Sequence, residues 1–261
     1  MLRNSLSILF ALLFTFQLIS ATAIHRWDEE LPCKTNAECL KRGLPLRKPS
    51  PVVKRGALHP RQSNTVSSST YRISVFRGQG VVGFMDKTPN ANGQYTMSQD
   101  ASQRIIVSEP SLTPGGLSIS NYVSNNGYSY STLAAQIGPN SGGSILSTSS
   151  YNYAVITAST SSFDSTSGPA TPPNPSYTLY GVATGSTSPL ETNTWYQTAA
   201  GSDNLFTNWV NSDGTTLDRP QIMYDTVNAN FVITGCATCY QAQFPNNNAY
   251  AVDFARAKVT T

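Results

Sequence analysis

Histidine is almost absent from this sequence. Its 261 residues include two histidines, His25 and His59, and both precede residue 62. The region from Gln62 onward therefore lacks the side chain that ordinarily titrates near pH 7, which excludes Ser-His-Asp or Cys-His nucleophiles and imidazole-rich zinc or copper sites. A Gly-x-Ser-x-Gly elbow is absent as well. We expect no metal and no cofactor, and a non-enzymatic role is favoured.

Charge is scarce and unevenly distributed. Only 12% of the residues are charged, which argues against a coiled coil or a charged disordered tail. Residues 1–61 hold ten Lys and Arg against four Asp and Glu, whereas residues 62–261 hold seven against ten. If the basic part is removed, the remainder is mildly acidic, so we expect no nucleic-acid partner.

Long apolar runs are missing, apart from one near the N-terminus. Residues 6–19 form an uncharged apolar run behind Arg3, and Ala21-Thr22-Ala23 then supplies the small residues that a signal peptidase accepts. This pattern predicts a secretory signal peptide, residues 1–23, cleaved after Ala23. A membrane anchor is the alternative, but the run is short for the ~30 Å of bilayer hydrocarbon, so we expect no membrane span in the mature chain.

The next segment, residues 24–61, is rich in Lys, Arg and Pro. It contains Lys54-Arg55 and ends on Arg61, and dibasic pairs in exposed Pro-rich chain are typical of kexin-type processing sites. We therefore expect a removed pro-segment and a mature chain that begins at Gly56 or Gln62. An ordinary basic linker is the alternative.

The four cysteines form two close pairs, Cys33 with Cys39 and Cys236 with Cys239. In an oxidising compartment a disulfide between Cys236 and Cys239 is the expected state. The C-x-x-C spacing also occurs in redox motifs and zinc half-sites, but zinc needs four ligands and a thioredoxin-like site needs a βαβ frame. We expect a small-loop disulfide that pins a hairpin.

Residues 62–261 are dominated by Ser, Thr, Asn, Gly and Tyr. Short alternating or β-branched runs recur between turn signals, which predicts one all-β domain, an antiparallel β-sandwich or barrel, after the processed leader. A Ser/Thr/Pro-rich loop is expected at residues 158–176, because Pro donates no ladder hydrogen bond. Short helices are expected at residues 133–137 and 205–210. The expected strands are residues 71–76, 81–84, 104–107, 117–123, 151–156, 177–182, 221–224, 231–234 and 250–254.

Carboxylates are the remaining candidates for catalysis, because glycoside hydrolysis needs only an acid and a base or nucleophile. Glu109 precedes a proline and Glu191 lies in a Ser/Thr/Pro-rich stretch, so we expect both to be exposed. Asp213, Asp218 and Asp225 cluster in the sequence. Asp213 begins an Asp-Gly turn, however, and Asp218 with its neighbouring arginine is equally typical of a surface ion pair.

Aromatic residues suit sugar binding better than catalysis. The chain has 13 Tyr and three Trp. Trp195, Tyr196 and Trp209 are the candidate glycan-binding residues because they flank loop-like segments. The alternative is that these rings fill the core with their polar ends at its rim.

The C-terminal stretch Cys236-Ala-Thr-Cys239-Tyr-Gln and the closing segment at residues 252–259 resemble the end of fungal phialide-type secreted cell-wall proteins. Residues 81–93 are similar to the N-terminal strands of that family, and the leader resembles that of fungal secreted precursors. The resemblance implies a secreted, cell-wall-associated β-protein with no catalytic residues to carry over.

Two functions follow from these patterns. The first is a secreted, non-enzymatic extracellular or cell-wall-associated β-protein, whose partner is cell-wall polysaccharide or a host surface component. The alternative is a glycan-binding or glycoside-cleaving secreted protein that uses Trp195, Tyr196, Trp209 and the Asp213, Asp218 and Asp225 group.

Overall fold

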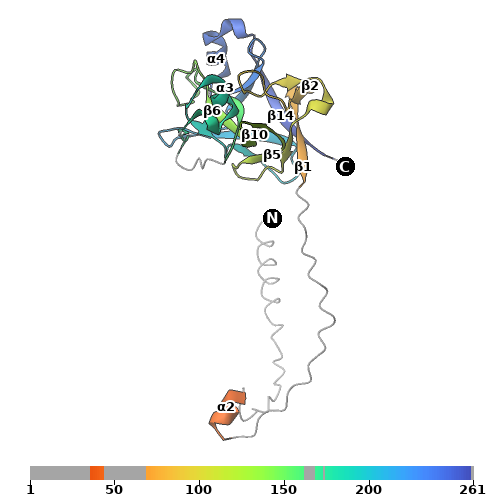
Figure 1. The fold of residues 1–261 in the computed structure, drawn as a ribbon, viewed down its shortest axis with the longest axis vertical. Helices are drawn as coiled ribbons and strands as arrows, with labels where there is room; N and C mark the ends of the chain where they lie inside the picture. The colour runs from red at the N-terminus through yellow and green to blue at the C-terminus, as the bar shows by residue number, and fades with distance from the viewer. Residues whose placement is uncertain (1–35, 44–68, 162–167, 173, 260–261) are drawn as a thin grey trace, which may run out of the picture. The chain divides into compact units, whose positions relative to one another are not determined.

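The computed structural model describes residues 36–43, 69–161, 168–172 and 174–259 (Figure 1). The chain divides into two units, residues 1–63 and 64–261. In the first unit the described part contains the short helix α2 (Asn36–Lys41). The second unit, the β domain, holds the strands. The expected cleavage residues lie outside the described part of the chain: Ala23, Lys54, Arg55 and Arg61.

Eight antiparallel strands of the β domain close into a barrel (Figure 1). The ring runs β14, β12, β13, β7, β6, β5, β4 and β1, and β1 pairs again with β14. The all-β prediction is confirmed, and between sandwich and barrel the structure has the barrel. The ring strands are β1 (Thr70–Arg77), β4 (Ile106–Ser108), β5 (Leu117–Asn125), β6 (Tyr128–Ile137), β7 (Tyr153–Ser159), β12 (Gln221–Asp225), β13 (Asn230–Thr234) and β14 (Tyr250–Lys258).

The closing ladder between β1 and β14 shows how the sequence pattern produces the barrel. Its register runs from Tyr71 opposite Lys258 to Phe76 opposite Asp253. Alternate residues of a strand point to opposite faces, so Ile73 and Val75 of β1 are fully buried while Phe76 is only partly covered. On β14 the same alternation buries Phe254 and exposes Asp253. On β1 and β14 one face therefore builds the core, and the other is partly exposed.

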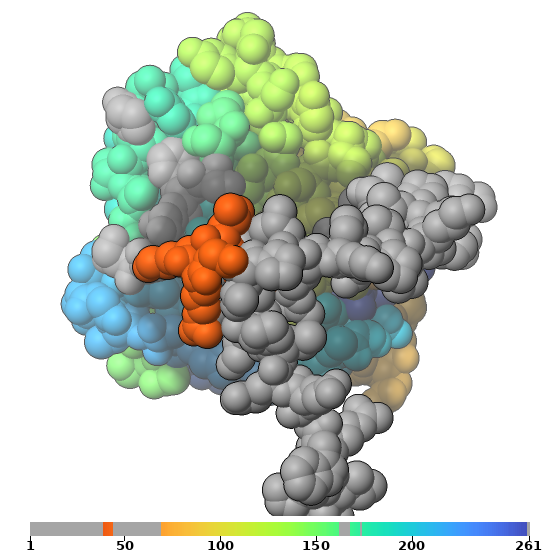
Figure 2. All heavy atoms as spheres, turned by 90° about the horizontal axis from the view of Figure 1, so that it is seen from below, coloured from red at the N-terminus to blue at the C-terminus, as the bar shows by residue number. Residues whose placement is uncertain are grey.

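Six shorter strands lie off this ring. One of them, β10, pairs with β14 beyond the end of β12 and carries two short partners, β9 and β11. The space-filling view shows segments from distant parts of the chain sharing one face, with teal and light-blue residues beside lime-green ones (Figure 2). The shorter strands are β2 (Gly80–Met85), β3 (Met97–Ser98), β8 (Leu190–Glu191), β9 (Trp195–Tyr196), β10 (Asn204–Val210) and β11 (Thr216–Asp218).

The strand predicted at residues 177–182 is wrong, because helix α3 (Leu179–Thr184) occupies it. Thr178 caps this helix through its Oγ1, which accepts a hydrogen bond from the Gly181 amide at 2.8 Å. Gly185 ends the helix with a φ of 77°, a conformation that favours glycine. The other helices of the β domain are α4 (Ala237–Gln243) and the 3-10 turns η2 (Ala101–Gln103), η3 (Pro175–Tyr177) and η4 (Pro245–Asn247).

Both predicted helices are wrong as well, because residues 133–137 lie in β6 and residues 205–210 lie in β10. In β6, Ala135 lies opposite Ile156 of β7 and opposite Glu191 of β8. Such ladders on both sides override the intrinsic helix preference of a Leu-Ala-Ala-Gln segment. Of the loop expected at 158–176, residues 158–159 lie in β7, Ala170 pairs with Leu190 and residues 175–176 lie in η3, while residues 162–167 and 173 lie outside the described part of the chain.

Candidate functional site

A groove of about 560 Å³ lies where β14 changes neighbours. Val252 of β14 pairs with Ile222 of β12, and two residues further on Phe254 pairs with Leu205 of β10. The strands β10 and β12 therefore follow one another along β14 instead of pairing with each other. The groove forms at this junction, and the turn between β1 and β2 borders it.

Alternate residues of β14 supply part of the groove lining, namely Ala251, Asp253 and Ala255. Because residues two apart on a strand share a face, the carboxylate of Asp253 is flanked by two small side chains that leave room above the strand. Phe76 lies opposite Asp253 in the closing ladder and also lines the groove. The groove thus combines a carboxylate with a partly exposed aromatic ring.

A second aromatic ring, Phe206 of β10, lines the groove together with Arg219. The Arg219 guanidinium carbon lies 4.8 Å from the centroid of the Phe206 ring. Its Nε donates a hydrogen bond to the Tyr196 hydroxyl at 3.4 Å and lies 3.8 Å from the Asp218 carboxylate. Tyr196 in turn donates a hydrogen bond to Asp218. These contacts hold the arginine in place although its φ of 53° is uncommon for a non-glycine residue.

Tyr196 therefore packs beneath two residues that line the groove, Arg219 and Phe206. The side chain is 8% exposed, and its ring centroid lies 5.9 Å from that of Phe206. Burial, followed by the hydrogen bond to Asp218, raises the pKa of its hydroxyl. None of the three predicted glycan-binding residues lines the groove, but Tyr196 contacts two residues that do, Phe206 and Arg219.

Trp195 and Trp209 are core residues, so their prediction as glycan-stacking platforms needs correction. Both have 0% exposure. The Trp195 ring stacks on Phe254, with centroids 6.4 Å apart, and its Nε1 donates to the Leu133 carbonyl at 3.3 Å. A buried ring offers no face to a sugar, and the alternative interpretation of core aromatics describes both tryptophans.

The three clustered aspartates have separate structural roles. Asp213 accepts hydrogen bonds from Thr215 within its own turn, and Asp218 accepts one from Tyr196. Asp225 is fully buried, and its carboxylate accepts hydrogen bonds from the side chains of Asn228, Tyr240 and Asn247 and from the amides of residues 227 and 228. Asp225 therefore closes a turn with its lone pairs satisfied, and no catalytic group of three forms.

Glu191 is the notable carboxylate that the sequence misassigned, because it is 1% exposed instead of lying in an open loop. The Val210 amide donates to both of its oxygens, at 3.1 and 3.3 Å. Burial raises the pKa of Glu191 to about 8 in spite of that hydrogen bond, which lowers it. Strand β8 is only two residues long, so no alternating pattern could reveal the burial.

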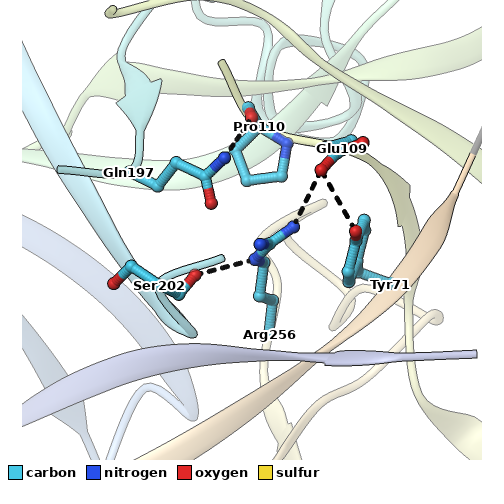
Figure 3. A network of polar contacts seen from close by, with 6 residues as sticks. All are labelled: Tyr71, Glu109, Pro110, Gln197, Ser202 and Arg256. Carbon is cyan, nitrogen blue, oxygen red and sulfur yellow. Dashed lines mark hydrogen bonds and ion pairs between the residues drawn. The ribbon is translucent and has the colours of Figure 1, made fainter. Parts of the chain in front are cut away.

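A polar network around Arg256 ties two loops to β14 (Figure 3). The Arg256 side chain is 5% exposed, and its Nε donates to the Ser202 carbonyl at 2.9 Å. Its Nη1 lies 3.5 Å from Glu109, and its guanidinium carbon lies 4.2 Å from the Tyr71 ring centroid. Beside it, Gln197 donates to the Pro110 carbonyl at 3.1 Å. The network joins the loops that follow β4 and β9 to the closing strand.

Removal of the arginine from this network should destabilise the barrel. We expect Arg256→Ala to lower the free energy of unfolding by about 1–3 kcal/mol, since it removes the packing of a buried side chain on the Tyr71 ring and its hydrogen bond to the Ser202 carbonyl. Glu109→Gln is the control and should cost less than about 1 kcal/mol, because the Glu109 side chain is 53% exposed. Urea denaturation measures both values, and equal losses would contradict this assignment of roles.

Cys236 and Cys239 form the expected disulfide, with a Cα separation of 5.2 Å. The bridge lies at the start of α4, where the Cys236 Sγ accepts a hydrogen bond from the Cys239 amide. The expectation that it pins a hairpin is therefore wrong. The residues covered by the structure contain no group of three or more His, Cys, Asp or Glu that could hold a metal ion. No helix among those residues is long and apolar enough to cross a membrane.

Comparison of the chain with protein-family models, with curated proteins and with solved structures finds no match. The structure itself gives the class of protein: a closed antiparallel β-barrel with a polar and aromatic groove beside its closing strand.

Proposed function

We propose that this chain is a secreted, non-enzymatic β-barrel of the extracellular space or cell wall that binds neutral polysaccharide in its groove. The observation that carries the proposal is the pair of partly exposed rings, Phe76 and Phe206, on a groove that also holds hydrogen-bonding side chains. A sugar ring has an apolar C–H face and a rim of hydroxyls, so it needs both kinds of contact. The signal-peptide pattern at residues 1–23 supports the secreted location.

The polar side chains of the groove match the hydroxyl rim of a sugar. Gln79, Asn204 and Gln221 provide amides, each with donors and an acceptor, and all three are exposed. Arg219 adds donors and Asp253 adds acceptors. Small-molecule sites commonly combine such sparse polar groups with aromatic walls.

The carboxylates favour binding over cleavage. Among the described residues that line the groove, Asp253 is the one carboxylate. Both the retaining and the inverting mechanism of glycoside hydrolysis use two carboxyl groups that flank the scissile bond. Glu191, whose pKa is raised to about 8 as a general acid would require, is buried and does not line the groove.

Binding to insoluble chitin and β-glucan, followed by titration with their soluble oligosaccharides, tests the proposal. We expect Phe76→Ala and Phe206→Ala each to weaken binding about tenfold, because stacking on one ring is worth about 0.5–1.5 kcal/mol beyond the buried area. Tyr128→Ala is the matched control, since Tyr128 is 48% exposed and does not line the groove. It should bind as the unmodified protein does.

Three results would contradict the proposal. Release of reducing sugar would show an enzyme. Equal binding by the groove variants and the Tyr128→Ala control would place any polysaccharide site elsewhere, and binding only to a host glycoprotein would replace the wall polysaccharide as partner.

A further inference from the structure

Two arginines of the β domain, Arg72 and Arg104, have no carboxylate partner among the described residues, as is also true of Arg77. Arg219 lies 3.8 Å from Asp218, and Arg256 lies 3.5 Å from Glu109. Arg72 and Arg104 have no such ion pair within 4.0 Å among the described residues. In a region where acids outnumber bases ten to seven, arginines without an ion pair among the described residues are an unusual feature.

The strand register brings these two arginines together. Arg72 of β1 lies opposite Ile106 of β4. Arg104 is two residues before Ile106, in extended chain whose intervening residue, Ile105, is fully buried. Because alternate residues share a face, Arg104 points to the same outer face as Ile106 and its partner Arg72. Diagonal neighbours of this kind are within reach of long side chains.

Arg104 is held in position without an ion-pair partner among the described residues. Its guanidinium carbon lies 3.5 Å from the centroid of the Phe84 ring, and its Nε is buried without a hydrogen-bond partner among the described residues. Burial, followed by the positive charge of Arg72, lowers the pKa of Arg104. The carboxylate of Asp86, the residue opposite Arg104, accepts a hydrogen bond from the Thr88 amide in its own loop.

We propose that Arg72 and Arg104 together bind an oxyanion, the carboxylate, sulfate or phosphate group of an acidic ligand. An oxyanion removes the repulsion between the two guanidinium groups and accepts hydrogen bonds from their planar forks, a geometry that carboxylate and phosphate match. The Phe84 ring holds the Arg104 guanidinium in place before the anion binds, which reduces the conformational entropy lost on binding. This site is separate from the groove, because neither arginine lines it.

Calorimetric titration of the full chain at low ionic strength tests this inference, with inorganic phosphate, inorganic sulfate and oligogalacturonate as three probes. We expect at least one probe to bind, and Arg72→Gln and Arg104→Gln each to weaken its binding at least tenfold. Arg77→Gln is the matched control, because Arg77 is an exposed arginine of the same strand that stacks on Tyr250. It should leave the affinity unchanged.

The probes also separate the possible sources of the anion. Binding of phosphate or sulfate assigns the site to those groups, and binding of oligogalacturonate alone assigns it to an acidic sugar. The inference is overturned if no probe binds, if both glutamine variants bind as the unmodified chain does, or if Arg77→Gln weakens binding equally. If Arg104→Gln fails to fold because it loses the contact with Phe84, the Arg72→Gln variant alone tests the inference.

The groove proposal and this inference fail independently. Arg72→Gln should keep its binding to neutral β-glucan, and Phe206→Ala should keep its binding to the oxyanion. Loss of both activities in either variant would instead indicate one shared site.

Discussion

The stability of the protein should fall by about 4–5 kcal/mol as the pH rises from 4 to 9, and Glu191→Gln should abolish most of that fall. Glu191 has a pKa of about 8 in the fold against an ordinary value of 4.5. Between those values the folded state keeps a proton that the unfolded state has lost, so rising pH favours unfolding. At 1.36 kcal/mol per pKa unit, the full difference gives the stated magnitude, which is present below pH 4.5 and lost by pH 8.

Glutamine is the suitable replacement because it keeps the shape and the carbonyl oxygen that the Val210 amide approaches at 3.1 Å. Urea denaturation at a series of pH values gives the free energy of unfolding for both proteins. Glu109→Gln serves as the control and should retain the pH dependence of the unmodified protein, since Glu109 is exposed. Parallel pH profiles for the unmodified protein and Glu191→Gln would refute the role of this carboxyl.

Trp195→Ala should lower the free energy of unfolding by about 3–5 kcal/mol, the range typical of removing a large buried aromatic side chain. The ring has 0% exposure, stacks on Phe254 and donates a hydrogen bond to the Leu133 carbonyl. Truncation leaves a cavity in the core and an acceptor without its donor. Thermal or chemical denaturation measures the loss, and Tyr128→Ala provides the exposed aromatic control.

The same variant separates a core tryptophan from a glycan platform. A platform residue would lose polysaccharide binding while the stability stayed close to that of the unmodified protein. Such a result for Trp195→Ala would restore the surface role that its burial excludes.

Local signals in the sequence predicted much of the barrel correctly. Alternation at residues 71–76 and 250–254 anticipated β1 and β14, because one buried face requires every second residue to be apolar. The pair Asn126-Gly127 forms the turn between β5 and β6, where both residues have positive φ, 50° and 80°, a conformation that Asn and Gly tolerate. These features depend on neighbours in the chain, so the sequence displays them directly.

The candidate site was harder to predict, because exposure is not a local property. Trp195 and Tyr196 are adjacent in sequence and share the two-residue strand β9, yet one stacks on Phe254 in the core and the other backs the groove. Phe76, Phe206 and Asp253 meet only because β1 and β10 both pair with β14. No spacing in the sequence connects these residues.

The class of fold, the Cys236–Cys239 bridge and most strands of the ring follow from local sequence signals, since propensity, alternation and turn residues act within a few positions. The tertiary structure alone decided the closure of β1 on β14, the burial of Glu191 and the strand state of residues 133–137. Each of these depends on pairing between segments far apart in the chain. Hydrogen-bond ladders and desolvation at those contacts outweigh the local preferences that the sequence shows.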